Sequence, residues 1–567
     1  MPIYAVPALL HRRTVCGAFA LVALAGAAPA HAQILGDPLS GPAGVTAGGE
    51  AENYLRYLQS LGRAPLTTWS LRQFSPRTID SLVGSDTTHP WAHSTFFRGL
   101  RQRSGAAVLP IVASARFNSA YPFGSNDGPV WAGRGATAAL QGGVAWRHGP
   151  LTAVLDPMVF VAQNEAFRLQ PNGFSNALRF ADGDFSTNVD RPQRFGDGTY
   201  SRFDPGESTI RLDALGVGLG VTTAEQTWGP ATTFPVVLGN NAPGIPHFFI
   251  GTNHPTNVYI GRAQAQVVYG LEQQSAWSPV TGPNDYTDIL HAGRTRFMSG
   301  LIATFSPGAI PGLEVGALRF FHQAWLGHIS GAQLRTPFEG LVKTSLPQQD
   351  VPGIDDRDAL KNQLASVFTR WVLPHSGFEL YGEYGHEDHN YDTRDLLEEP
   401  DHSRIAMAGM RKAFAHADGS FSAVRAEWID GYAPTLERHR AEGLVYVHNP
   451  LRQGHTQDGQ LLGADIGVGA PGGAIVAFDS YSASGRTTVF VMRTSQDNFS
   501  DFEVTGTRYR SATDGIGTVG ASRVMLGDLT DLTVGLAASY RSGSRRTDAA
   551  HGWNANLQVA ATLHPRR

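Results

Sequence analysis

Residues 257–270 read NVYIGRAQAQVVYG, and their side chains alternate between two kinds along the whole stretch. One set is small, apolar or aromatic and consists of Tyr259, Gly261, Ala263, Ala265, Val267 and Tyr269. The opposite set is more polar and consists of Val258, Ile260, Arg262, Gln264 and Gln266. Because successive side chains of a β-strand point to opposite faces, this alternation predicts a strand with one apolar and one polar face.

The length of this predicted strand fits a lipid bilayer. Ten residues at about 3.3 Å each, tilted by about 40°, rise roughly 25 Å, the height of the apolar band on an outer-membrane barrel. Tyr259 and Tyr269 would then lie at the two membrane interfaces. Residues 378–385 and 532–540 repeat the alternation, and we expect the face with more small or charged residues to line the lumen.

Connections of unequal length favour such a barrel over a water-soluble β-sandwich or propeller, in which strands would show the same period of two. Residues 147–150 make a tight connection, whereas residues 163–209 and 330–358 are long and polar. Short turns at one end and long loops at the other are typical of outer-membrane barrels. We therefore predict an all-β fold, a transmembrane antiparallel β-barrel of about 16 to 18 strands, with a small N-terminal periplasmic helical region.

Composition excludes several other classes of protein. Charged residues make up 17% of the 567 residues, against about 25% in a typical soluble protein. The single cysteine, Cys16, excludes a disulfide scaffold and a cysteine-based zinc site. The net charge of −4 predicts no nucleic-acid partner. No run of 18 apolar residues follows the N-terminus, which argues against a transmembrane helix.

The first 32 residues have the organisation of a secretory signal peptide. Residues 11–13 are basic, residues 15–28 are apolar, and residues 30–32 form a small-x-small cleavage site. The apolar run is shorter than the ~20 residues that span a bilayer. We therefore predict that residues 1–32 are a cleaved signal peptide, that the chain passes through the inner membrane, and that it resides in the outer membrane.

Residues 33–100 differ from the rest of the chain and are predicted to form a periplasmic helical region ahead of a barrel over residues 101–567. Apolar residues recur there at helical spacing before Gly62, which predicts one amphipathic helix, and they are Ala51, Tyr54, Leu55, Leu58 and Leu61. Ser75 and Pro76 suit the start of a second helix, and a third over residues 70–74 is an open alternative, as is a mobile leader. The apolar stripe should pack on or into the periplasmic mouth of the barrel.

Motifs for catalysis are weak in this sequence. Residues 467–472 and 515–520 fit G-x-G-x-x-G, but neither opens a helix, so we interpret both as glycine-rich strands or turns. Residues 386–402 are rich in Asp, Glu and His and would suit calcium better than zinc, although a solvated acidic loop is the simpler interpretation. We predict no catalytic residue, no cofactor and no metal ion, and a protein that is not an enzyme.

Three segments resemble the capsule-assembly Wzi family of outer-membrane proteins. Residues 118–135, NSAYPFGSNDGPVWAGRG, look like that family's first-hairpin loop. The Trp-Gly-Pro at residues 228–230, followed by VLGNNAPGIP at residues 237–246, resembles its most distinctive stretch. Residues 451–465, with Gly454 and His455, are similar to its late G-x-x-x-G-H region.

This resemblance implies a barrel of about eighteen strands with a periplasmic helical bundle, acting as a lectin that holds capsular polysaccharide on the cell surface. The expected partners are capsular or other surface polysaccharide and outer-membrane lipid, and the protein is expected to be a monomer. A porin or substrate channel is the alternative function, because a polar lumen would serve it equally well. An outer-membrane enzyme is a second alternative, which would need clustered carboxylates or a Ser/His pair at one rim.

The long loops contain the residue types that a glycan-binding surface needs. Aromatic rings pack on the C–H groups of sugars, and planar polar groups bind their hydroxyls. The predicted polysaccharide-binding candidates are Phe167, Arg168, Arg179, Phe180, Tyr200, Arg202, Tyr391 and Arg394. Phe203 and His402 belong to the same pool of loop residues.

The residues of the second family-like segment are predicted to be structural instead. An Asn-Asn pair and a Gly-Pro step suit a fixed irregular turn whose backbone groups need side-chain partners. The residues concerned are Trp228, Gly229, Pro230, Asn240, Asn241 and Pro246.

Overall fold

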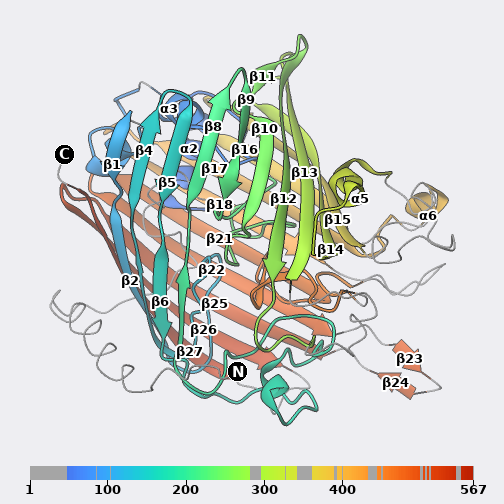
Figure 1. Ribbon diagram of the computed structural model, residues 1–567. Coiled ribbons are helices and arrows are strands. Elements are labelled where there is room, and N and C mark those ends of the chain that lie inside the picture. Colours follow the sequence, from blue (N-terminus) through green and yellow to red (C-terminus); the bar gives the residue numbers. More distant parts are fainter. Residues whose placement is uncertain are drawn as a thin grey trace, which may run out of the picture.

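The structure, a computed structural model, is dominated by one antiparallel sheet that closes on itself (Figure 1). It describes residues 48–565 except 85, 102–103, 281–294, 326, 341–360, 388–392, 399, 432–443, 449–450, 499–501, 505–506, 510–511 and 544–550. The last strand, β27 (Gly552–Leu563), pairs with β2 (Ile111–Asn118) and closes the barrel. Among the described residues, no helix is long and apolar enough to span a membrane.

The first half of the barrel contains short strand segments: β1 Gly105–Val108, β3 Gly135–Gln141, β4 Val144–His148, β5 Leu151–Leu155, β6 Met158–Ala162, β7 Tyr200–Asp204, β8 Thr209–Ala214, β9 Val217–Thr222, β10 His247–Thr252 and β11 Thr256–Asn257. The second half contains long strands: β12 Gly261–Gln273, β13 Thr295–Pro307, β14 Leu313–Ala324, β15 Lys361–Leu373, β16 Phe378–Glu387, β17 Arg404–Ala415, β18 Phe421–Asp430, β21 Ala470–Ser482, β22 Gly485–Asn498, β25 Ala512–Met525 and β26 Thr530–Gly543. Two small hairpins lie outside the barrel sheet: β19 Thr456–Gln457 with β20 Gln460–Leu461, and β23 Phe502–Val504 with β24 Thr507–Tyr509.

The described part of the barrel sheet has 23 segments. Five of its strands are interrupted and consist of two segments each, namely β1–β2, β3–β4, β5–β6, β7–β8 and β10–β11. Counting each interrupted strand once leaves eighteen strands, an even number as in bacterial outer-membrane barrels. The predicted range of 16 to 18 strands is confirmed.

The connections differ in length at the two ends of the barrel, which we call the short-turn end and the long-loop end. The predicted tight connection is confirmed, because β4 and β5 are joined through Gly149, whose φ is +55°. At the opposite end, residues 163–199 connect β6 to β7 and residues 223–246 connect β9 to β10. The short-turn end is uppermost in Figure 1 and also holds the C-terminal end of β27.

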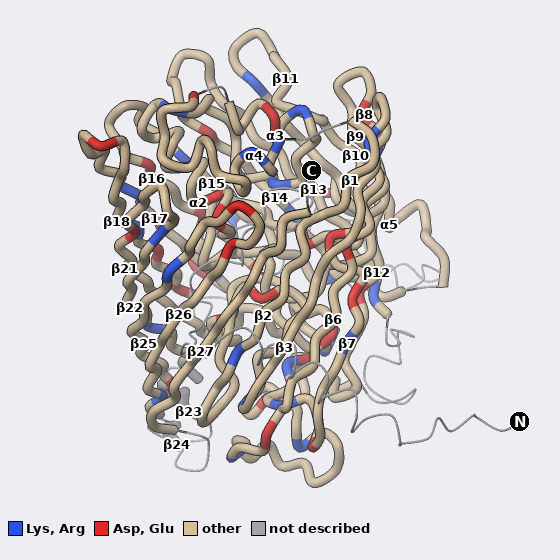
Figure 2. Tube along the Cα trace, turned by 90° about the vertical axis from the view of Figure 1, so that its left-hand side faces the viewer, with Lys and Arg blue, Asp and Glu red and all other residues tan. Residues whose placement is uncertain are grey.

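The two faces of the strands have the predicted polarity. On β16, Glu379 and Glu383 are buried inside the barrel, whereas Leu380 is 45% exposed on the outside. Figure 2 shows charged positions on many of the wall strands and near the rims, while β27 contains no Lys, Arg, Asp or Glu along its described length. An apolar outer wall around a polar lumen is what a bilayer requires of a transmembrane barrel.

The strand that was predicted over residues 257–270 begins later than expected. Gly261 is its first residue, and the alternation from there to residue 270 is as predicted, with Gln264 and Gln266 buried inward. Residues 258–260 instead make the turn between β11 and β12. Tyr259 has a φ of +65° and a fully exposed side chain there, so its assignment to a strand face was wrong.

The described N-terminal region contains the two predicted helices and one that was not predicted. The described helices of the chain are α2 Glu50–Ser60, α3 Pro76–Val83, α4 Thr95–Gly99, η1 Ala177–Phe180, α5 Gly331–Arg335, η3 Thr336–Phe338 and α6 Thr393–Glu398. Gly62 follows α2 with a φ of +73°, and the Ser75 hydroxyl accepts the Thr78 N–H at the start of α3. The alternative helix over residues 70–74 is wrong, because Leu71 makes a β-bridge with Trp228.

Helix α2 lies inside the short-turn mouth of the barrel, with every residue buried. Its apolar stripe packs on side chains of the barrel wall, including Phe421 and Tyr481. Tyr54 stacks on Trp91 at 4.2 Å between ring centroids. Burial of the stripe at this mouth is what its helical spacing predicted.

The polar side of α2 is buried as well, which the sequence pattern did not predict. The Arg56 guanidinium donates to Glu52 on its own helix at 2.7 Å and to Glu379 of β16 at 2.9 Å. Glu50 lies 2.5 Å from the Arg486 guanidinium of β22, and burial nevertheless raises the pKa of Glu50 to about 7. Ion pairs to the wall therefore fix the helix in one position.

Two loops from the long-loop end fold back into the lumen and form a second layer beneath α2. We call residues 223–246 and the described residues of 444–469 the inward loops. Trp228, Phe234 and Tyr446 belong to one large apolar cluster with wall residues such as Ile302 and Leu364. The described lumen is therefore packed with side chains at two levels.

Candidate functional site

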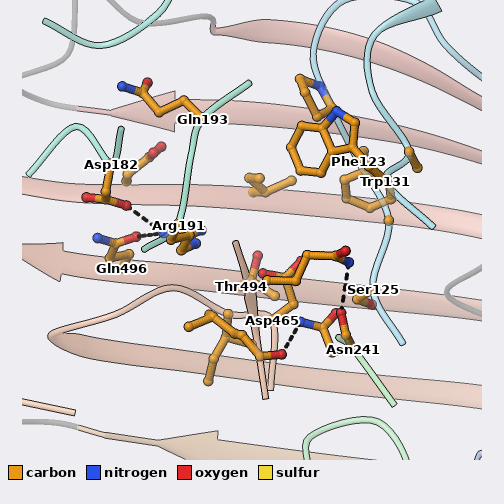
Figure 3. Close-up of a pocket in the computed structure, with 18 of the residues that line it drawn as sticks. Phe123, Ser125, Trp131, Asp182, Arg191, Gln193, Asn241, Asp465, Thr494 and Gln496 are labelled. Atoms are coloured by element: carbon orange, nitrogen blue, oxygen red, sulfur yellow. Dashed lines mark hydrogen bonds and ion pairs between the residues drawn. The ribbon is translucent and has the colours of Figure 1, made fainter. Parts of the chain in front are cut away.

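A cavity of about 220 Å³ lies at the long-loop side of the inward loops (Figure 3). Four connections line it, those that follow β2, β6, β9 and β18, and the ends of β22, β25 and β26 complete its wall. A larger hollow of about 590 Å³ lies at the short-turn end, between residues 66–67 and the turns near residues 259 and 308. We take the first cavity as the candidate site, because aromatic and charged side chains of several loops converge there.

Aromatic side chains from several loops line the cavity. Phe123 and Trp131, which lie together on one side in Figure 3, come from the connection after β2, and Phe167 comes from the connection after β6. The Asn118 amide holds the first of these loops closed by donating to the carbonyls of Phe123 at 3.0 Å and Ala132 at 2.9 Å. The rings are thus presented by backbone that is itself hydrogen-bonded.

Charged side chains form the other side. Arg191 donates to Asp182 at 3.2 Å and to Gln496 at 3.3 Å. Asp182 also accepts the backbone N–H groups of Asp184 and Phe185, each at 2.9 Å. These contacts fix Arg191 and Asp182 before any ligand binds.

One acceptor and one donor of the cavity lining stand out because neither has a hydrogen-bond partner among the described residues. One is the Asp465 carboxylate, whose pKa is raised by burial although the nearby Arg191 lowers it. The other is the buried indole N–H of Trp131. An unsatisfied acceptor and an unsatisfied donor at one cavity suit a ligand with hydroxyl groups, which can both donate and accept.

The Asn-Asn pair ties loops together at the floor of the cavity. The Asn241 side chain donates to the Leu461 carbonyl at 3.0 Å and accepts the Asn126 N–H at 3.1 Å. The Asn240 carbonyl accepts the Gly128 N–H at 2.8 Å. These contacts support the structural role that the sequence predicts for the pair, although Asn241 also lines the cavity.

The Trp-Gly-Pro step is buried beneath the same floor. Trp228 is fully buried in the lumen cluster. Gly229 has a φ of +85° and donates its N–H to the Ser70 carbonyl, and a β-carbon there would meet the Glu383 carboxylate at 2.2 Å. Only glycine therefore fits this position without displacing its neighbours.

The two prolines of this segment contribute carbonyl groups to the packing. The Pro230 carbonyl accepts a hydrogen bond from Arg56 of α2 at 2.9 Å. The Pro246 carbonyl accepts the Leu271 N–H of β12 at 3.1 Å. The segment thus connects the helix in the mouth to the barrel wall.

Replacing both Asn240 and Asn241 with Ala should reduce the amount of folded barrel in the outer membrane, because the Leu461 carbonyl and the backbone of Asn126, on two other loops, lose side-chain partners at about 1 to 3 kcal/mol each. The fraction that runs as a compact, heat-modifiable band on an SDS gel measures this. Asn176→Ala, in an exposed turn, is the matched control. Normal barrel levels with lost ligand binding would show that the pair is a binding site instead.

Of the seven predicted binding candidates that the structure describes, it places Phe167 alone in the cavity lining. Arg168 beside it is exposed. The Arg179 guanidinium lies 4.4 Å from the ring centre of Phe180, and Phe180 is buried.

The other candidates lie apart from the cavity lining or outside the described residues. Tyr200 stacks on Phe195 at 4.5 Å, and Arg202 pairs with Asp458 at 2.6 Å. Arg394 is exposed on α6, which projects from the barrel in Figure 1. Tyr391 lies outside the described residues.

The two additional loop residues are also away from the lining. Phe203 is 72% exposed, and the His402 carbonyl is bonded to the imidazole of His386 at 2.9 Å. The acidic segment 386–402 is only partly described, and within the described residues no group of three His, Cys, Asp or Glu could hold a metal ion.

Sequence reasoning missed most of the residues that line the cavity. Trp131 lay in the first family-like segment but was not selected as a binding residue. Asp182, Arg191 and Asp465 had no local signal, because the connection after β6 and the connection after β18 meet only in the folded chain.

Comparison with known proteins agrees with this architecture. A family model described as capsule assembly protein Wzi matches residues 137–542. The solved structure of Wzi from Escherichia coli, described as an outer-membrane protein involved in group 1 capsule assembly and as a carbohydrate-binding β-barrel, has a TM-score of 0.57 at 14% identity, covering 91% of this chain and 99% of that one. Acinetobacter baumannii OccAB3 has a TM-score of 0.39 at 8% identity, covering 80% and 98%. Pseudomonas aeruginosa OpdQ has a TM-score of 0.37 at 7% identity, covering 82% and 99%. No curated protein sequence matches the chain.

Proposed function

Since the chain belongs to the capsule assembly protein Wzi family, we propose that it is a lectin of the outer membrane that holds a surface polysaccharide on the cell. In bacterial barrels the short turns face the periplasm and the long loops face the outside. The cavity between Trp131, Phe167 and Asp465 then faces the medium, and α2 closes the periplasmic mouth. We further propose that residues 1–32 are removed on export and that the protein acts as a monomer without enzymatic activity.

The observation that carries this proposal is a small aromatic and polar cavity at the outer end of a barrel whose described lumen is packed. Aromatic faces suit the C–H side of a sugar ring, and the unsatisfied groups of Trp131 and Asp465 suit its hydroxyls. The solved Wzi structure, which shares this fold, is described as carbohydrate-binding.

The alternative of a porin or substrate channel fits the structure less well. A conducting pore needs a continuous aqueous path, whereas α2 and the inward loops are buried in two apolar clusters that include residues of the wall. In planar bilayers the full-length chain should show no large open-channel steps. Steps of porin size would favour the channel instead.

A cell-based experiment tests the proposed function. Replacing both Trp131 and Phe167 with Ala should weaken polysaccharide binding about tenfold or more, because each ring contributes roughly 0.5 to 1.5 kcal/mol beyond its buried area. Cells that make only this variant should release more surface polysaccharide into the medium than cells with the natural chain. Tyr259→Ala, an exposed aromatic at the opposite end, should have no effect. Equal retention by both variants would contradict the assignment of the cavity.

A further inference from the structure

The cavity carries more negative than positive charge. Five of the described lining residues are aspartates, and two are arginines. Both arginines are already engaged by carboxylates of the lining. Arg541 donates to Oδ1 of Asp514 at 3.2 Å and to Oδ2 at 2.5 Å, and Arg191 pairs with Asp182. No cation of the described lining is therefore left over for an acidic ligand.

Asp465 is a carboxylate of this lining whose hydrogen-bonding capacity is open. It lies on the second inward loop, at the edge between that loop and the wall strand β22. The positive charge of Arg191 acts to lower the pKa of Asp465, but Asp465 accepts no hydrogen bond from any described residue. A carboxylate in this state has room for several donors and gains most from a charged one.

The size of the cavity limits what can enter. At about 220 Å³ it is smaller than the ~300 Å³ at which pockets for drug-sized ligands begin. One sugar unit, at a chain end or on a side branch, is therefore the part of a polysaccharide that the cavity can enclose. The charge of that one sugar unit then determines whether the cavity attracts or repels it.

We propose that this cavity selects a sugar unit that is neutral or carries a free amine, with Asp465 accepting its hydroxyl or ammonium donors, and that it rejects uronic acids and other acidic sugars. An acidic unit would place a carboxylate beside Asp465 and Asp182 in a partly desolvated site, where like charges repel more strongly than in water. An ammonium group would form a charge-assisted hydrogen bond there. This inference rests on the proposed function and adds the chemical class of the ligand.

An array of neutral, amino and acidic oligosaccharides, probed with the detergent-solubilised full-length chain, tests the inference. It should include β-1,4-linked tetramers of glucose, glucosamine and glucuronate, which share a backbone and differ in charge. Amino and neutral glycans should bind most tightly, and acidic glycans should bind at least about tenfold more weakly. This ranking is measured on the natural chain, so it stands as a test even where a variant does not fold.

Asp465→Asn then identifies the residue responsible. It should weaken binding of the amino-sugar glycans about tenfold, the loss expected for a charge-assisted bond, and should affect neutral glycans less. Asp430→Asn is the control, because it makes the same charge change at a residue paired with Arg404 at 3.1 Å and outside the cavity lining.

The possible outcomes separate the inference from the function on which it rests. The inference would be overturned if an acidic glycan bound most tightly, or if Asp465→Asn left the order of glycan affinities unchanged. Polysaccharide binding itself would still stand in both cases. Binding to no glycan of any class would overturn both.

Discussion

Replacing Arg56 with Met should lower the free energy of unfolding of the barrel by about 3 to 5 kcal/mol, the usual cost of breaking a buried ion pair from one side. Arg56 is fully buried and pairs with Glu52 of its own helix and with Glu379 of the wall. Its guanidinium also donates to the Pro230 carbonyl of an inward loop. The substitution removes the cation that joins the helix, the wall and the loop, and leaves two carboxylates buried with fewer partners.

The temperature or urea concentration at which the folded band disappears from an SDS gel measures this loss. Arg394→Met is the matched control, because Arg394 makes an exposed pair with Glu398 on one helix and should contribute less than about 1 kcal/mol. Equal stabilities of the two variants would show that α2 is not anchored through Arg56.

Replacing Glu427 with Ala should have the second large effect, a loss of more than about 4 kcal/mol together with a rise in conductance. Glu427, on β18, accepts the backbone N–H groups of Thr232, Thr233 and Phe234 at 2.7 to 2.9 Å. It also accepts the hydroxyls of Thr232 at 2.6 Å and Tyr381 at 2.8 Å. One carboxylate thus holds the first inward loop against the wall, and without it several buried donors are unsatisfied.

Bilayer conductance and thermal stability of the same Glu427→Ala preparation provide the two measurements. Asp430→Asn on the same strand should change neither, because Asp430 pairs outside the lumen-filling layer with Arg404. If the variant is destabilised but its conductance equals that of the natural chain, the first inward loop does not close the lumen.

The barrel itself could be predicted from the sequence, because its cause is local. Alternation with a period of two, as at Gln264 and Gln266 or Glu379 and Glu383, follows directly from strand geometry between lipid and lumen. The end of a strand is less well specified. Tyr259 continues the alternating pattern, yet it lies in a turn, since nothing in the pattern marks where pairing stops.

The contents of the lumen could be predicted only in part. The spacing of Tyr54, Leu55 and Leu58 correctly indicated a buried stripe on a helix. The same spacing says nothing about Arg56, which pairs with Glu379 on β16, 323 residues away, and donates to the Pro230 carbonyl of an inward loop. Burial of the polar face of α2 depends on these distant partners, which the sequence near the helix does not contain.

The cavity was the least predictable part for the same reason. Its residues run from the connection after β2 to the end of β26, and they meet only because two loops fold inward. A search for aromatic and arginine residues in long loops found Phe167. It missed Trp131 and Asp465, whose importance comes from unsatisfied polar atoms at a shared surface.

Surface plasmon resonance can show directly whether the outer end of this closed barrel binds a surface polysaccharide. The detergent-solubilised full-length chain is passed over polysaccharide extracted from the bacterium that makes it. We expect saturable binding that free polysaccharide competes away and that the Trp131→Ala, Phe167→Ala double variant weakens about tenfold. Absence of saturable binding by the natural, folded chain would contradict the proposed function.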